Sequence, residues 1–196
     1  MSESWRGIVT SSTRRYLELC TDQFELVQAK LGSRKFEVSV GDVVEYHKQG
    51  EELVADKLIP RRNSLARSYE GKVKRLVANL DYIFLMTASG ALFNPVAIDR
   101  VLAAAHSESI PICLIVNKID LEGALKEIEP LCQVYQKWNY ELFFISAKHA
   151  IGLERLVDKL NSPSIKLAAF AGVSGVGKST LLNKLIPNAS QRIREV

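Results

Sequence analysis

The sequence predicts two successive architectures, a small β-barrel followed by an α/β domain with a mainly parallel sheet. Short alternating strands separated by turn residues fill residues 1–68. Apolar strands alternate with helices over residues 80–196, and a basic linker is expected at 69–79. A glycine-rich stretch at residues 172–179 matches the phosphate-binding loop (P-loop), which belongs in such an α/β domain.

The composition is that of an ordinary globular chain. Of its 196 residues, 47% are apolar and 24% are charged, and the net charge is +4. The first residues show no secretory signal, and the apolar runs are too short to span a bilayer. Cys20, Cys113 and Cys132 form no zinc-binding pattern. We therefore expect a monomeric cytoplasmic protein with reduced thiols and no membrane partner.

Five short strands in the N-terminal part predict the barrel. They cover residues 6–12, 15–21, 24–30, 38–48 and 52–59. An OB-fold agrees with this pattern because it has five strands and commonly binds nucleic acid, although an SH3-like barrel would look similar. Four aromatic residues could form a base-stacking platform, but a small barrel also needs aromatic side chains in its core. They are Tyr16, Phe24, Phe36 and Tyr46.

A basic cluster follows the last barrel strand, over residues 57–75. Its only acidic residue is Glu70. Such a cluster suits a polyanion, so Arg61, Arg62 and Arg67 are candidate RNA-binding residues. The alternative is a solvated linker, in which the charge serves only solubility.

Strand–helix alternation predicts the parallel sheet of the second domain. The expected strands cover residues 80–88, 110–120, 141–149 and 164–172. Asn94 and Pro95 have the residue types of a helix N-cap and first helical position. Further helices are expected at 122–138 and 152–160, the first of them interrupted or kinked by Pro130.

The P-loop pattern G-x-x-x-x-G-K-S lies between the last predicted strand and a helix. Its glycines let main-chain N–H groups turn toward phosphate oxygens, and the helix adds its positive dipole end. Lys178 would reach the β- and γ-phosphates, and the Ser179 hydroxyl would bind Mg²⁺, so both are candidate catalytic residues. The expected phosphate-binding residues are Gly172, Val173, Ser174, Gly175, Val176, Gly177, Lys178, Ser179 and Thr180.

Two shorter motifs end the preceding strands. Asn117, Lys118, Ile119 and Asp120 spell N-K-I-D, and the Asp120 carboxylate can accept two hydrogen bonds from guanine. Ser146, Ala147 and Lys148 spell S-A-K, and the Ala147 N–H could point at the guanine O6. Each motif alone could be a polar strand end, but ligands bind at this edge of a parallel sheet. Together with the P-loop they predict a guanine-nucleotide site.

The order of these motifs is unusual, since N-K-I-D and S-A-K both precede the P-loop. In ordinary GTPases the phosphate loop comes first. The motifs can still converge if the domain is circularly permuted, because domain termini often lie close together.

With a basic N-terminal barrel and this motif order, the chain resembles the ribosome small subunit-dependent GTPase A family. The stretches IPRRNSLAR, FNPVAIDR and AGVSGVGKSTLLNKL are similar to that family too. The resemblance implies an OB-fold, a permuted GTPase domain that uses GTP or GDP with Mg²⁺, and a role in late maturation of the small ribosomal subunit. It also implies that small-subunit ribosomal RNA contacts the protein and stimulates GTP hydrolysis.

The sequence departs from the family after Ser179. The family continues with a switch threonine, a D-T-P-G segment and a zinc domain, and none of these occurs in the remaining residues. We therefore expect this span to bind GTP better than it hydrolyses it, and to contain no zinc ligands. The alternative function is a non-catalytic RNA-binding module gated by guanine nucleotide.

Overall fold

The computed structural model describes residues 3–32, 37–69 and 71–186. The chain divides into two compact units, Met1–Leu80 and Asp81–Val196. Each unit is described by itself. Within the described ranges, no helix has the length and apolar character needed to cross a bilayer.

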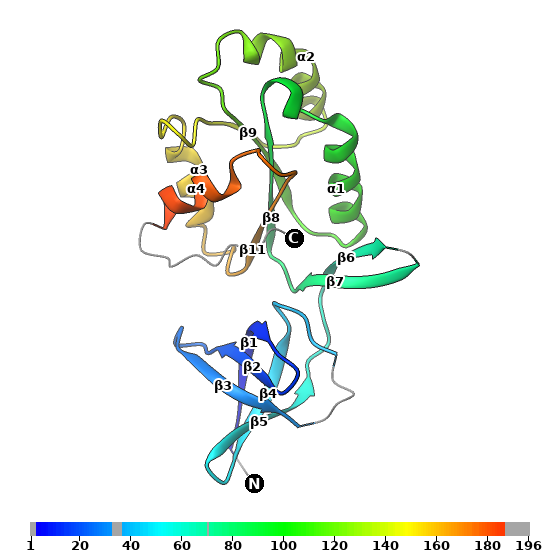
Figure 1. Ribbon diagram of the computed structural model, residues 1–196, viewed down its shortest axis with the longest axis vertical. Helices are drawn as coiled ribbons and strands as arrows, with labels where there is room; N and C mark the ends of the chain where they lie inside the picture. The colour runs from blue at the N-terminus through cyan, green and yellow to red at the C-terminus, as the bar shows by residue number, and fades with distance from the viewer. Residues whose placement is uncertain (1–2, 33–36, 70, 187–196) are drawn as a thin grey trace. The chain divides into compact units, whose positions relative to one another are not determined.

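The first unit contains a closed five-stranded barrel in which the strands follow the order β1-β2-β3-β5-β4 (Figure 1). The β3–β5 pair is parallel, whereas β1 pairs antiparallel with both β2 and β4. This crossing order is that of a Greek-key barrel and confirms the predicted OB-fold. The strands are β1 (Ser4–Ser12), β2 (Tyr16–Cys20), β3 (Leu26–Leu31), β4 (Val43–Gln49) and β5 (Glu52–Leu58).

Side chains along each strand alternate between the interior and the exterior of the barrel, and the inward-facing ones form its core. In β2, Leu17 and Leu19 are fully buried while the residues between and before them face outward. Buried side chains from all five strands make one cluster, whose aromatic ring is that of Tyr46 in β4. Its members are Val9, Leu17, Leu19, Ala29, Val44, Tyr46 and Ala55. Tyr16 and Phe24 are exposed, and Phe36 lies outside the described residues.

Residues 69–79, which the sequence analysis expects to be a linker, belong largely to a β-hairpin. Strand β6 (Ser64–Tyr69) pairs antiparallel with β7 (Lys72–Ala78), and Gly71 takes a φ of 74° in the turn between them. The side chain of Asn79, at the hairpin's base, donates to the Gly41 carbonyl (2.9 Å). Apolar residues interleaved with the basic ones allow a strand, and this bond ties it to the barrel.

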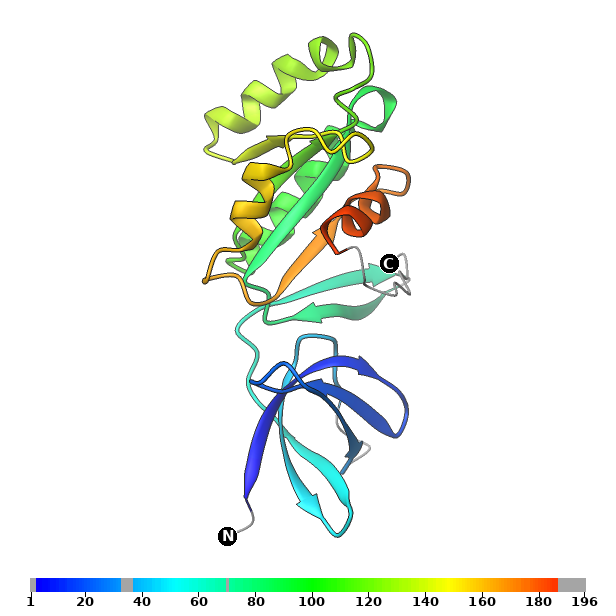
Figure 2. The same cartoon turned by 90° about the vertical axis from the view of Figure 1, so that its left-hand side faces the viewer.

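The second unit is built on a parallel sheet in the order β10-β9-β8-β11 (Figures 1 and 2). Its strands are β8 (Tyr82–Ala88), β9 (Ile112–Asn117), β10 (Leu142–Phe144) and β11 (Ala168–Ala171). Every residue of β8 is buried, as its continuous apolar sequence predicts. Asp81 directly precedes β8, and its carboxylate accepts hydrogen bonds from the N–H groups of Lys166 and Leu167 (both 2.9 Å), just before β11. These bonds join the start of the first strand to the start of the last.

Helices cover both faces of this sheet. They are α1 (Pro95–Ser107), α2 (Ala124–Lys137), α3 (Glu154–Leu160) and α4 (Lys178–Leu185), with a 3₁₀ turn η1 (Gly90–Leu92). Asn94 caps α1 by accepting from the Ala97 N–H (3.1 Å), and Pro95 follows it, as predicted.

Pro130 was expected to interrupt or kink its helix, and the interruption does not occur, because α2 runs without a break on both sides of it. Ile128, Cys132 and Tyr135 of α2 are buried, and the Tyr135 hydroxyl donates to Asp99 of α1 (2.9 Å). This packing outweighs the single main-chain hydrogen bond that proline cannot make.

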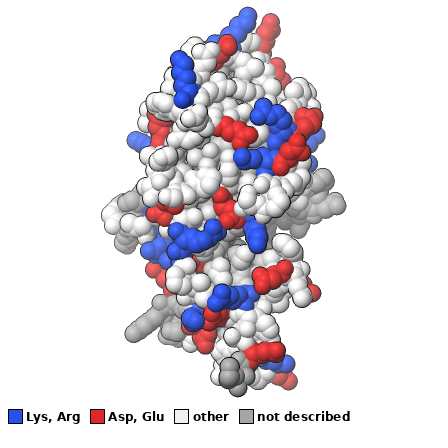
Figure 3. All heavy atoms as spheres, turned by 180° about the vertical axis from the view of Figure 1, so that it is seen from behind, with Lys and Arg blue, Asp and Glu red and all other residues white. Residues whose placement is uncertain are grey.

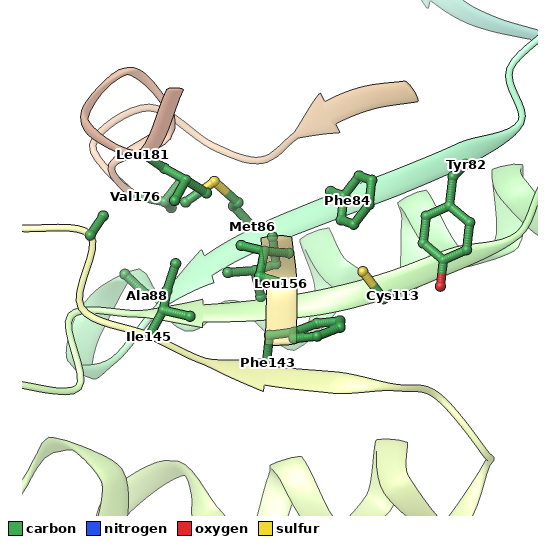
Figure 4. Packing of buried hydrophobic residues seen from close by; sticks show 12 residues of the cluster. Tyr82, Phe84, Met86, Ala88, Cys113, Phe143, Ile145, Leu156, Val176 and Leu181 are labelled. Atoms are coloured by element: carbon green, nitrogen blue, oxygen red, sulfur yellow. The ribbon is translucent and has the colours of Figure 1, made fainter. Parts of the chain in front are cut away.

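The core on one face of the sheet supports the P-loop. Val176 from the loop and Leu181 from α4 are fully buried, and they point toward Met86 of β8 in Figure 4. The Phe84 and Phe170 rings stack at 5.1 Å and hold β11 against β8. The loop between β11 and α4 is therefore anchored on both sides by apolar contacts.

Candidate functional site

Two glycines fix the path of the P-loop. Gly172 has a φ of 147°, and a side chain there would collide with the Met86 carbonyl oxygen of the neighbouring strand. Gly177 has a φ of 98°, and a side chain there would collide with the side-chain amide of Asn117. Only glycine allows both the turn and these close approaches. The main chain is thereby shaped into a cradle at the start of α4, where N–H groups and the helix dipole favour an anion.

Lys178, the first residue of α4, folds back over this loop. Its ammonium group donates to the carbonyl oxygens of Gly172 (2.8 Å) and Val173 (3.0 Å). Both partners are neutral main-chain groups. The positive charge of Lys178 therefore lies beside the cradle without a carboxylate partner among the described residues.

Asn117 joins the three motifs that the sequence analysis places at one sheet edge. Its side-chain nitrogen donates to the Val176 carbonyl of the P-loop (2.7 Å). Its side-chain oxygen accepts from the Ala147 N–H of the S-A-K segment (2.9 Å). Asn117 is almost completely buried, so these hydrogen bonds are shielded from water. Loss of either partner would leave a buried polar group unsatisfied, which is costly. The predicted convergence of the motifs is thus explained by one side chain.

The Ala147 N–H, expected to point at guanine O6, is used by Asn117 in this structure. The sequence does not reveal this, because a main-chain N–H at a strand end has several partners within reach.

A cavity of about 260 Å³ opens beside these bonds. It is lined by Asn117, Lys118, Asp120, Leu121, Lys148, Gly177 and Thr180. The cavity therefore contains residues of all three motifs. Ile119 belongs to the same segment, and its N–H donates to the Ile145 carbonyl (3.3 Å).

Asp120 brings a negative charge to this cavity. A hydrogen bond from the Ser146 side chain lowers the pKa of Asp120, and the positive charge of the nearby Lys148 acts in the same direction. The His149 Nε2 lies 3.6 Å from the Asp120 carboxylate. Asp120 is thus kept ionised, as an acceptor of two hydrogen bonds from a ligand must be.

Two contributors to the site were not predicted. Ser89, buried after β8, donates through its hydroxyl to the Lys118 carbonyl (2.8 Å) and through its N–H to the Asn117 carbonyl (3.0 Å). Leu121 adds an apolar wall to the cavity. No sequence pattern singles out Ser89, whereas Leu121 could have been found as the residue that follows N-K-I-D.

Ser179 is suited to a divalent cation only as one ligand among several. Its side chain is exposed beside Lys178 at the start of α4, so the hydroxyl can reach an ion placed over the cradle. Within residues 3–32, 37–69 and 71–186, no group of three or more His, Cys, Asp or Glu side chains could hold a metal. The other oxygen ligands of a Mg²⁺ ion would be phosphate and water, which is usual for this ion.

The three arginines selected as RNA-binding candidates have different environments. Arg61 makes two hydrogen bonds to Asp42 (2.7 and 2.8 Å), whose side chain has 0% exposure; we call this pair the arginine clasp. Arg62 donates to the Asn79 carbonyl (2.9 Å). Arg67 is exposed on β6, directly opposite Lys74 of β7. Arg61 is therefore structural, and Arg67 is the candidate most accessible to a ligand.

The distribution of surface charge agrees with the small number of accessible arginines. On the face shown in Figure 3, basic side chains lie among acidic ones and form no single continuous basic area. An RNA contact on that face would be confined to small groups of residues.

A parallel sheet whose last strand leads into a P-loop, with N-K-x-D and S-A-K at the ends of earlier strands, defines a circularly permuted P-loop GTPase fold. A family model described as RsgA GTPase matches residues 58–196. The chain belongs to this family.

Curated relatives named small ribosomal subunit biogenesis GTPase RsgA match almost the whole chain. The protein of Actinobacillus pleuropneumoniae serotype 5b (strain L20) is 32% identical over 198 residues, which cover 97% of this chain and 57% of the relative. The protein of Haemophilus influenzae (strain PittEE) is 30% identical over 204 residues, which cover 100% of this chain and 58% of the relative. The chain thus spans somewhat more than half the length of these relatives.

Two solved structures share the fold. The crystal structure of YjeQ from Thermotoga maritima has a TM-score of 0.79 and 28% identity, covering 98% of this chain and 68% of that one. The structure of YloQ, described as a circularly permuted GTPase, has a TM-score of 0.70 and 21% identity, covering 95% and 66%. The second likeness concerns the fold alone.

Proposed function

We propose that the second unit binds guanine nucleotides with Mg²⁺. The observation that carries this proposal is the bond pair of Asn117, which holds the phosphate cradle beside a cavity that contains the ionised Asp120. In this assignment Asp120 accepts from guanine N1–H and the 2-amino group, a donor pair that adenine does not offer. Lys118 and Lys148 line the base pocket with their alkyl chains.

The phosphates occupy the cradle formed by residues 172–180. Lys178 leaves the Gly172 and Val173 carbonyls, which water can satisfy, and pairs with the β- and γ-phosphates. Ser179 would contribute its hydroxyl to a Mg²⁺ ion, which would neutralise part of the charge of the bound phosphates. In this assignment Asn117 is a positioning residue, since its polar atoms are bonded to protein.

We infer that binding and chemistry separate in this 196-residue span. Phosphoryl transfer depends on groups that orient the attacking water and the γ-phosphate. The D-x-x-G pattern that would supply them does not follow Ser179 in this sequence. The span therefore binds GDP and GTP, with negligible hydrolysis even when small ribosomal subunits are added.

The biological role that we propose is maturation of the small ribosomal subunit, in the cytoplasm. It is supported by the names of the curated relatives and by the OB-fold, which commonly binds nucleic acid. Ribosomal RNA would be contacted by the first unit. Among its candidate arginines, Arg67 on the β6–β7 hairpin is the best placed for a phosphate.

One experiment with two measurements tests this function. Titration of the parent chain with GDP, ADP and xanthosine diphosphate should give binding to GDP alone, with discrimination against ADP of ~10⁴-fold. Asp120→Asn should weaken GDP and improve xanthosine diphosphate binding, because the amide donates where the carboxylate accepted. Comparable affinities for ADP and GDP would contradict the guanine assignment. Phosphate release by the same chain with saturating small subunits should stay at background, and stimulated turnover would contradict the separation of binding from chemistry.

A further inference from the structure

A groove on the barrel combines aromatic and acidic side chains. Its volume is about 680 Å³, within the usual size of a ligand site. Residues of β1, β3, β4, β5 and the turn between β2 and β3 form its walls, including Trp5, Asp22, Glu25, Val27, Tyr46 and Leu53. The groove lies wholly within the first unit and contains none of the nucleotide-site residues.

Tyr46 presents an unused polar group to this groove. Its side chain is only 6% exposed, and its hydroxyl has no hydrogen-bond partner among the described residues. Burial, together with the negative charges of Asp22 and Glu25, raises the pKa of Tyr46. No described group occupies this hydroxyl, so a ligand in the groove could donate a hydrogen bond to it.

The uncompensated charge of the groove is negative. Asp22 and Glu25 form no ion pair with any residue in the described part of the chain. Arg6, a basic residue of the lining, is paired with Glu45 (3.1 Å), a carboxylate that Lys57 also contacts (2.8 Å). The two unpaired carboxylates disfavour phosphate groups, so the groove is a poor path for an RNA backbone. Lysine and arginine side chains would be attracted.

The aromatic side chains favour the same ligand. Trp5 is 40% exposed and its ring lies 5.8 Å from that of Tyr46, so a cation can approach the indole face. Phe24, at the tip of the β2–β3 turn, is 88% exposed with a φ of 60°, and Leu26 beside it is also exposed. Neither residue lines the groove, but Phe24 lies between the lining residues Gln23 and Glu25, and Leu26 lies between Glu25 and Val27. Exposed apolar side chains of this kind suit a polypeptide better than a free ion.

We propose that this groove binds a lysine- or arginine-containing segment of a protein partner. The cationic side chain lies against Trp5 and between the two carboxylates, and it donates to the Tyr46 hydroxyl. Apolar residues of the same segment pack on Phe24 and Leu26. This assignment is independent of the nucleotide site.

Tryptophan fluorescence of the 196-residue chain tests the proposal. With Trp138 replaced by phenylalanine, Trp5 is the remaining indole and reports on the groove. A short peptide that alternates arginine and alanine should change this signal with saturation, and the same peptide with citrulline in place of arginine should bind much more weakly. Asp22→Asn with Glu25→Gln should weaken binding of the arginine peptide about tenfold.

Two further variants separate binding from folding. Glu18→Gln with Glu51→Gln removes the same charge from barrel residues outside the groove and should bind the peptide about as the parent does. Tyr46→Phe should keep or raise the thermal midpoint, because the hydroxyl has no partner among the described residues of the barrel. The same substitution should lower the affinity for the arginine peptide by about threefold. The proposal is wrong if the Asp22/Glu25 variant binds the peptide as the parent does. It is also wrong if a single-stranded RNA oligonucleotide changes the Trp5 signal at lower concentration than the peptide.

Discussion

The phosphate loop and the arginine clasp each hold a basic side chain, but against different partners. Lys178 is bonded to two neutral carbonyl groups of its own loop. Arg61 is bonded through two nitrogens to Asp42, which is fully buried. Water or an anion can replace a neutral carbonyl partner, whereas removing Arg61 would leave a buried carboxylate unpaired. A cation is therefore available for a ligand only when its release leaves no buried charge behind.

The β6–β7 hairpin offers a third arrangement. Arg67 and Lys74 are direct cross-strand partners, so two like charges face each other on one side of the ribbon. Such a pair is mildly destabilising, and an anion placed between the two side chains would relieve the repulsion. The three arrangements differ in what each cation loses when a phosphate approaches it.

The largest effect is expected in the clasp. Arg61→Ala should lower the free energy of unfolding of the first unit by about 3 kcal/mol, because Asp42 would remain buried without its partner. Chemical denaturation followed by a probe in the barrel measures this loss. Arg67→Ala is the matched control and should change the stability by less than about 0.5 kcal/mol. Equal effects of the two substitutions would remove the distinction between a structural and an available arginine.

A loss of similar size, but in binding, is expected at the phosphate loop. Lys178→Ala should lower the affinity for GDP by about 100-fold, since the substitution removes a charged hydrogen bond to the phosphates. The thermal midpoint of the nucleotide-free chain should change little, because only two bonds to accessible carbonyls are lost. Calorimetric titration and thermal unfolding of the same variant check the two statements. A variant that unfolds more easily and still binds GDP normally would reverse the comparison.

The smallest effect concerns the hairpin. Replacing Arg67 and Lys74 by alanine should weaken binding to ribosomal RNA a few-fold. Each lost phosphate contact should also reduce the slope of log affinity against log salt by about 0.7 to 0.9. The measurement is a series of titrations with the small-subunit RNA at increasing salt. An unchanged slope in the double variant would mean that the hairpin makes no phosphate contact.

The convergence of the three motifs at one sheet edge could be predicted from the sequence because these motifs fix main-chain geometry. Gly172 and Gly177 occupy positions that exclude any side chain, and the strand before them must end at the same edge as the strand that ends at Asn117. Spacing within such motifs therefore carries three-dimensional information. The bridging bonds of Asn117 could not be foreseen, since they depend on the exact approach of loops that are far apart in the chain.

The basic cluster was harder to interpret because composition does not show where each basic side chain points or which residue it contacts. Residues 57–75 are rich in Lys and Arg, yet the sequence does not reveal that Asp42 would lie beside Arg61 or that residues 72–78 would form a strand. The missed hairpin has a local cause, since three of the first four residues of β7 are basic and weaken its apolar signal. Burial of a charge depends on long-range contacts that no short pattern records.

The joint between Asp81 and the start of β11 has a consequence for how the second unit is assembled. Strands β8, β9 and β10 are consecutive in both sequence and sheet, whereas β11 meets β8 only after a closed segment of 85 residues, measured at the Asp81–Lys166 bond. The entropy of closing a longer loop rises slowly, by about 0.6 kcal/mol per doubling, so the final stability changes little. The long connection has a larger effect on the order in which parts of the unit fold. Contacts between residues that are distant in sequence form late, and the N-terminal portion leaves the ribosome first. In this permuted chain the N-K-I-D and S-A-K segments, which we propose select the base, are therefore synthesised, and can fold, before the P-loop, which we propose holds the phosphates.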